Sequence, residues 1–284
     1  MTDKNREWKI LTLPFNQDFN DALRQQHQAA QFIALAGKYL IPQEPDDSNT
    51  NMRYSPEKKA LLGNELSNGF RLGLILTNLE IQLLNKVFDP IDIIQLDGRY
   101  RQQIFEEIQQ RLKDSGIDSF KLKDKLHYEV PFHPVLYGSP FTIHNQKYFD
   151  ENTYYRHNSE IVLNTIISDY KKTAPVRVWP HHFDTGTFIS LEENHGKISK
   201  SIGLGWAIPD AMVDEPYFYL SYWSESNSII PDLPRLPSGT WAIPDWNGAI
   251  LTHSEIISQG SSQAQKQLIE SFFKSGIEIL SKLK

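Results

Sequence analysis

The chain contains no cysteine among its 284 residues. This excludes a disulfide framework, a thiol nucleophile and a cysteine-based zinc site. No run approaches the roughly eighteen apolar residues of a membrane-spanning helix, and residues 1–15 lack the apolar core of a signal peptide. The net charge of −6 gives no attraction to nucleic acid or to an anionic membrane. We therefore expect a cytoplasmic protein whose partners include neither nucleic acid nor membrane.

Signature motifs of common enzyme classes are also missing. Gly203 and Gly205 lack the third glycine and the following helix of a dinucleotide-binding fingerprint. The chain has no GxSxG nucleophile elbow and no GxxxxGK[ST] phosphate-binding loop. We therefore expect no cofactor, and the sequence predicts no particular oligomeric state.

The spacing of apolar residues predicts the secondary structure. Helical spacing predicts four helices, the first with Asp18 as its N-cap and the last opened by a Thr252–Glu255 capping box. These helices cover residues 18–40, 100–113, 150–172 and 253–283, with a break in the last one at Gly260. Alternation predicts an antiparallel hairpin over 70–83 and strands over 91–96, 176–191, 198–207 and 216–223. Residues 241–251 form either a last strand or a hairpin with a tight turn at Asn247-Gly248. The expected fold class is α+β, with mostly antiparallel sheets flanked by helices.

The chain is long enough for one compact α+β domain over residues 1–284, which would bury about 70–75% of its unfolded surface. Residues 15–116 and 150–284 form two halves that each run helix, strands, helix. An irregular crossover with several prolines, residues 117–149, joins them. Two similar halves and one continuous sheet are both compatible with this order. The prolines of residues 229–239 predict an exposed loop, because proline does not enter a central strand.

The stretch 175–223 concentrates the unusual side chains, among them His181, His182 and Asp184. Alternate residues of a regular strand share a face, which would place His182 and Asp184 together. Such a pair either orients an imidazole as a general base or forms a structural hydrogen bond at a strand end. Even with His195 the pair supplies too few ligands for zinc or iron, so we expect no bound metal.

Carboxylates and aromatic rings complete the candidate site. Glu215 is either an acid–base residue or, preceding Pro216, an acceptor of backbone hydrogen bonds. Tyr219, Trp223 and Trp241 either line a cleft, where rings stack on a flat ligand, or pack within the sheet. The candidate ligand-binding residues are therefore His181, His182, Asp184, Glu215, Tyr219, Trp223 and Trp241.

Several motifs together resemble one family. These are APVRVWPHHFD at 174–184, GLGW at 203–206, Glu215-Pro216 with its aromatic run, and the LGLILTNLEIQLLN hairpin at 72–85. Their order over nearly the whole chain resembles the DUF5996 family, whose function is unknown. The resemblance therefore implies no catalytic residues. His181 and His182 stand where the family has small residues, which argues against a family-wide role for them.

Three functions are compatible with these features. The first is an uncharacterised DUF5996-like protein that binds a small molecule in a cleft of the C-terminal half. The second is a hydrolase that uses His182 with Asp184 or Glu215. The third is a structural or protein-interaction module, for which an apolar surface patch of several hundred Å2 would be expected.

Overall fold

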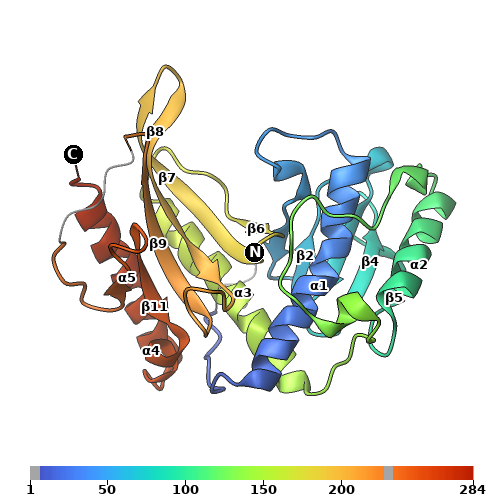
Figure 1. The fold of residues 1–284 in the computed structure, drawn as a ribbon, viewed down its shortest axis with the longest axis horizontal. Helices are drawn as coiled ribbons and strands as arrows, with labels where there is room; N and C mark the ends of the chain where they lie inside the picture. Colours follow the sequence, from blue (N-terminus) through green and yellow to red (C-terminus); the bar gives the residue numbers. More distant parts are fainter. Residues whose placement is uncertain (1–6, 227–232, 284) are drawn as a thin grey trace. The chain divides into compact units, whose positions relative to one another are not determined.

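The computed structural model describes residues 7–226 and 233–283, and these form an α+β fold with two antiparallel sheets (Figure 1). The predicted fold class is confirmed. The chain separates into two compact units. The N-terminal unit consists of Asn16–Thr153 and Val178–Phe183. The C-terminal unit consists of Tyr154–Arg177, the chain from Asp184 onward, and the arm that ends at Phe15.

The N-terminal unit is built on a five-stranded sheet in the order β1-β2-β3-β4-β5. Its elements are α1 Gln17–Leu40, β1 Arg53–Ser55, β2 Ala60–Leu62, β3 Arg71–Ile75, β4 Glu80–Leu84, β5 Pro90–Gln95 and α2 Arg101–Asp114. Helix α1 packs on β3 and helix α2 packs on β5. The predicted hairpin over 70–83 is confirmed as β3 and β4. Strands β1 and β2 have three residues each, too few for a visible alternation.

Helix α1 begins one residue earlier than predicted. Its N-cap is Asn16, whose side chain accepts a hydrogen bond from the backbone N–H of Phe19, so the expected cap at Asp18 is wrong. The helix is buried over most of its circumference, and this burial extends to polar side chains. Its buried polar residues are Gln25, Gln26, His27, Gln28 and Gln31. Buried amides need hydrogen-bond partners, because leaving them unpaired costs about 1–3 kcal/mol each.

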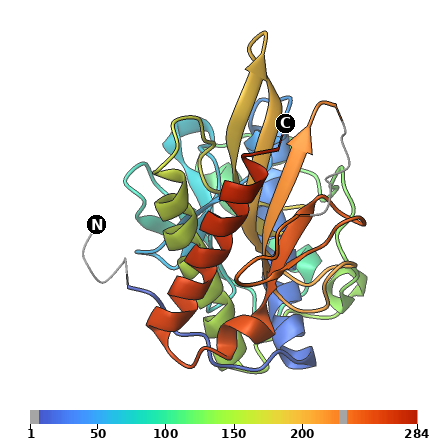
Figure 2. The ribbon, with the colours of Figure 1, turned by 90° about the vertical axis from the view of Figure 1, so that its left-hand side faces the viewer.

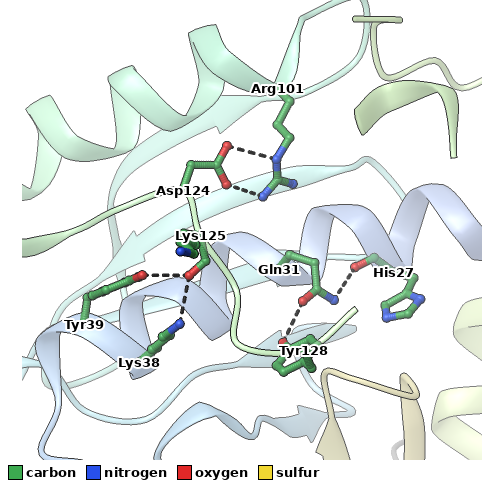
Figure 3. Close-up of polar contacts among 8 residues, drawn as sticks. All are labelled: His27, Gln31, Lys38, Tyr39, Arg101, Asp124, Lys125 and Tyr128. Carbon is green, nitrogen blue, oxygen red and sulfur yellow. Dashed lines mark hydrogen bonds and ion pairs between the residues drawn. The ribbon is translucent and has the colours of Figure 1, made fainter. Parts of the chain in front are cut away.

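The irregular segment over residues 122–142, which we call the strap, supplies partners for three of these five residues, Gln25, Gln28 and Gln31. Figure 3 shows the contact between Gln31 and Tyr128. It runs beside α1 and is joined to the helix by hydrogen bonds of side chains. The contacts along the helix are Asp21 with His133, Gln25 with Thr142, Gln28 with Pro131, Gln31 with Tyr128, and Lys38 and Tyr39 with the carbonyl of Lys125. Arg101 also donates two hydrogen bonds to Asp124, at 3.1 and 2.6 Å. Side chains of α1 thus pair with backbone groups of the strap, which in a strand would pair with the backbone of a neighbouring strand.

The C-terminal unit is built on a six-stranded sheet in the order β10-β11-β9-β8-β7-β6. Its elements are α3 Gln146–Ile167, β6 Arg177–Trp179, β7 Asp184–Asn194, β8 Lys197–Ala207, β9 Tyr217–Ser224, β10 Thr240–Trp241, β11 Gly248–Thr252, α4 His253–Ile257 and α5 Ser262–Leu280. The first turns of α3, and Val178 and Trp179 of β6, belong to the N-terminal unit.

Two helices cover one face of this sheet. Tyr155 of α3 stacks on Trp206 of β8, with ring centroids 5.1 Å apart. Phe273 of α5 meets Phe218 of β9 edge to face. Because Trp206 and Phe218 are paired across β8 and β9, both helices lie on the same face, and Figure 2 shows them in front of the strands.

One predicted strand is corrected by the structure. The strand expected over 176–191 is two strands, β6 and β7, joined by a turn at residues 180–183. Of the strand or hairpin expected over 241–251, the structure has the hairpin, formed by β10 and β11 with a loop over residues 242–247. The Thr252–Glu255 capping box and the break near Gly260 are confirmed. Residues 233–239 form the predicted loop, whereas 229–232 lie outside the described residues.

None of the helices in residues 7–226 and 233–283 combines the length and the apolar character that a membrane span requires.

We predict that Gln25→Ala lowers the free energy of unfolding by about 1–3 kcal/mol. The side chain of Gln25 accepts from the N–H of Thr142 and donates to its carbonyl, both at 2.7 Å, and alanine leaves both backbone groups unpaired. Urea unfolding measures the change. The control Gln102→Ala removes an exposed glutamine and should change the free energy by less than about 0.5 kcal/mol. Equal losses for the two variants would contradict the role of Gln25.

Candidate functional site

His181 and His182 lie on the turn between β6 and β7, not on a strand. The turn closes with a hydrogen bond of 2.7 Å from the Phe183 N–H to the Trp179 carbonyl. Phe183 has a positive φ of 55°, which reverses the chain before β7 begins at Asp184. The expectation that His182 and Asp184 share one face of a regular strand is therefore wrong.

The turn is fixed to α1 by polar and aromatic contacts. The carbonyl of Pro180 accepts hydrogen bonds from His27 Nε2 at 2.8 Å and from Gln31 Nε2 at 2.9 Å. Since His27 Nε2 faces an acceptor, it carries the proton. The His27 ring also stacks on Phe183, with centroids 4.9 Å apart and an interplanar angle of 4°. Both the backbone of the turn and its Phe183 side chain are thus held by α1.

Tyr128 of the strap connects this turn to the helix. Its hydroxyl donates to Gln31 Oε1 at 2.8 Å (Figure 3), and its ring contacts both His127 and His181. Burial raises the pKa of Tyr128, so the hydroxyl stays protonated and remains a donor. His181 also contacts the rings of Trp179 and His182, while His182 is exposed.

Asp184 and Tyr219 are brought together across the C-terminal sheet. The Tyr219 hydroxyl donates to Asp184 Oδ2 at 2.6 Å. The tyrosine lies directly over Gly186 and Gly205, where an added Cβ would come within 2.7 and 2.5 Å of its hydroxyl oxygen. Burial, reinforced by the charge of Asp184, raises the pKa of Tyr219 well above its usual value. The pair is a hydrogen-bond donor and acceptor that links β7 to β9.

Glu215 performs a structural role at the start of α4. Its Oε2 accepts hydrogen bonds from the Ser254 N–H at 3.0 Å and from the Ser254 hydroxyl at 2.6 Å. The alternative expectation of a backbone acceptor is therefore confirmed. The neighbouring His253 is fully buried, and its Nδ1 is hydrogen-bonded to the hydroxyl of Tyr155. Burial lowers the pKa of His253, although the charge of Glu215 opposes the shift.

The two candidate tryptophans have different surroundings. Trp223 lies on β9 and is 47% exposed. Trp241 lies on β10, and its indole N–H donates to the carbonyl of Pro234 at 2.9 Å. Trp223 is thus accessible to a ligand, whereas Trp241 ties the loop before β10 to its own strand.

A second group of polar side chains lines a hollow of about 270 Å3 in the N-terminal unit, which we call the Lys38 hollow. Its lining residues are Lys38, Gln43, Asp47, Asn49, Thr50 and His127. His127 Nε2 lies 3.2 Å from Asp47 Oδ2. Lys38 Nζ donates to the carbonyl of Lys125 at 2.9 Å. A cation, a carboxylate and an imidazole therefore meet in one solvent-accessible hollow.

The loop that forms one wall of the hollow is tightly attached to the end of α1. Gly37 permits this approach, because a Cβ there would lie 2.3 Å from the Asn49 carbonyl oxygen. The Asn49 side chain donates to the Gly37 carbonyl and accepts from the Glu44 N–H, both at 3.1 Å. Asp47 adopts a left-handed backbone with φ 57°, and its carbonyl accepts from Thr50. These bonds fix the backbone of the loop that carries Asp47.

The sequence interpretation missed His27, Gln31, Tyr128 and the lining of the Lys38 hollow. The helix that carries the first two contains the run RQQHQAAQ at 24–31. Polar residues there occupy helical positions that also face the interior, which is a signal for a buried polar contact. Among the residues that the structure describes, no group of three or more histidines and carboxylates is placed to hold a metal ion.

The chain matches no protein-family model, no curated protein and no solved structure. The resemblance to the DUF5996 family therefore stays a prediction.

We predict that acid destabilises the protein partly through His253. Its folded-state pKa lies below the unfolded value of about 6.5, so the unfolded chain binds more protons between the two pKa values. The free energy of unfolding should fall as the pH drops below about 6.5, by at most about 1.4 kcal/mol per pH unit, and level off below the folded-state pKa.

Urea unfolding at about pH 7.5 and about pH 5.5 measures this loss. In His253→Gln the loss between the two pH values should be smaller than in the natural protein. The control His195→Asn changes an exposed histidine with a positive φ, which asparagine tolerates, and should keep the full loss. An unchanged pH dependence in His253→Gln would show that another group is responsible.

Proposed function

We propose that this protein binds a small polar molecule in the Lys38 hollow. The observation that carries the proposal is the convergence of Lys38, Asp47 and His127 on one hollow of about 270 Å3. Ligand sites in proteins typically measure roughly 300–1,000 Å3, so the hollow suits a small metabolite. An ammonium, a carboxylate and an imidazole group in so small a space also favour a ligand of defined shape and charge.

The hollow is preformed, which lowers the entropic cost of binding. Asn49 and Gly37 hold the loop wall against α1. Lys38 and Tyr39 both donate to the Lys125 carbonyl, which holds the strap on the other side (Figure 3). Lys38 uses one of its three N–H groups in this contact and keeps two for a ligand.

The arrangement of the other candidates supports binding more than hydrolysis. Asp184 accepts from Tyr219 and Glu215 accepts twice from Ser254, so both carboxylates already have structural partners. A hydrolase based on His182 would need one of them as an acid or base. In this proposal the cleft first expected in the C-terminal half is replaced by the Lys38 hollow of the N-terminal unit.

We predict that Lys38→Met weakens ligand binding by about tenfold or more, because tenfold corresponds to about 1.4 kcal/mol and a charged contact is lost. The measurement is thermal shift and calorimetry with a panel of amino acids, carboxylic acids, amines and phosphate esters. Lys113→Met is the matched control, because Lys113 lines a separate hollow beside Phe120. Its binding should equal that of the natural protein.

The binding role is refuted if no compound of the panel stabilises the protein. It is also refuted if every compound that binds does so equally well to Lys38→Met.

A further inference from the structure

The charges in the Lys38 hollow specify the class of its ligand. Resting on the binding function proposed above, we infer that the ligand is a small zwitterion of the α-amino-acid class. Its carboxylate lies against Lys38 and its ammonium against Asp47. In this assignment each charged group of the hollow is paired with a ligand group of opposite charge.

Lys38 is the group that receives the carboxylate. Its Nζ bonds to the neutral carbonyl of Lys125 and lies 5.0 Å from the centre of the Tyr39 ring. Within the described part of the chain it forms no ion pair at the usual limit of 4.0 Å. The positive charge is therefore not neutralised by those residues, and a ligand carboxylate can accept its two remaining N–H groups.

Asp47 is the group that receives the ammonium. Its Oδ2 faces His127 Nε2 at 3.2 Å, which leaves Oδ1 without a hydrogen-bond partner among the described residues. A carboxylate offers about four acceptor positions, so a ligand ammonium can bind while the contact with His127 remains. His127 holds one oxygen of Asp47 and leaves the other to the ligand.

The same residues disfavour the competing ligand classes. A phosphate ester or a dicarboxylate carries two negative charges, and the carboxylate of Asp47 in the same hollow would repel the second one. A simple amine would leave Lys38 without a partner, and a simple carboxylate would leave Asp47 without one. An amino acid satisfies both groups and is small enough for a hollow of about 270 Å3.

The test is calorimetry at neutral pH with the twenty standard L-amino acids. Each amino acid that binds is compared with its deamino acid and its decarboxylated amine. Both analogues should bind about tenfold more weakly or worse, since each loses one charged contact. Amino acids that lack a charged side chain suffice, because the proposed contacts involve only the α-groups.

Two variants assign the contacts to the residues. The Lys38→Met variant should bind the amino acid no better than it binds the amine analogue. In Asp47→Asn the amino acid should bind no better than its deamino acid, and asparagine accepts the left-handed backbone of this position. Asp46→Asn is the control, because Asp46 lies in the same loop but does not line the hollow, and it should bind like the natural protein.

Three outcomes overturn the inference. Lys38-dependent binding of phosphate esters or dicarboxylates without any amino acid would overturn the zwitterion and leave the binding function intact. Amino-acid binding that is unaffected by Lys38→Met and Asp47→Asn would place the ligand elsewhere. Absence of any Lys38-dependent binding across the whole panel would overturn both the ligand class and the binding function.

Discussion

The carbonyl oxygen of Pro180 accepts two hydrogen bonds from α1, and much of the N-terminal unit depends on this kind of contact. Buried backbone groups need partners, and a segment without regular structure cannot supply its own. Helix α1 provides them from amide and imidazole side chains. Those side chains in turn would be costly to bury alone. The helix and the segments around it are therefore stable only together.

This mutual dependence also determines where the candidate site lies. Gln31 contacts both the turn, through Pro180, and the strap, through Tyr128. His127 adjoins Tyr128 in the strap and reaches Asp47 on the loop beside the end of α1. The charged groups of the Lys38 hollow thus come from three separated segments that are held by one helix. The walls of the hollow are held by hydrogen bonds of side chains and loop backbone rather than by regular strands.

The elements predicted correctly are those encoded by neighbouring residues. The period of 18–40 indicates α1, alternation over 70–83 indicates β3 and β4, and the Thr252–Glu255 box marks the start of α4. The turn at 180–183 escaped prediction because Phe183, and not a glycine or asparagine, has the positive φ there. Pro180 was the local signal of a break, because proline does not enter a central strand, but alternation of the residues on either side predicts a single strand.

The candidate site was less predictable because its contacts connect distant residues. Asp184 and Tyr219 meet only through the register of β7, β8 and β9, which no local pattern defines. Glu215 could be interpreted from its neighbour Pro216, and that interpretation proved correct. The lining of the Lys38 hollow resembles any solvated loop in sequence. The glutamine-rich run of α1 was the available signal, since such residues inside a buried helix require partners.

The placement of Tyr219 over Gly186 restricts the order in which substitutions can accumulate. A methyl group at Gly186 would lie 2.7 Å from the Tyr219 hydroxyl oxygen and 3.1 Å from Asp184 Oδ2, its two closest neighbours. Alanine at this position therefore requires the tyrosine hydroxyl to shift, although it is hydrogen-bonded to Asp184. Replacing Tyr219 by a smaller residue removes the closer contact. In a lineage of such proteins, substitution of the glycine would cost less after the tyrosine has been lost.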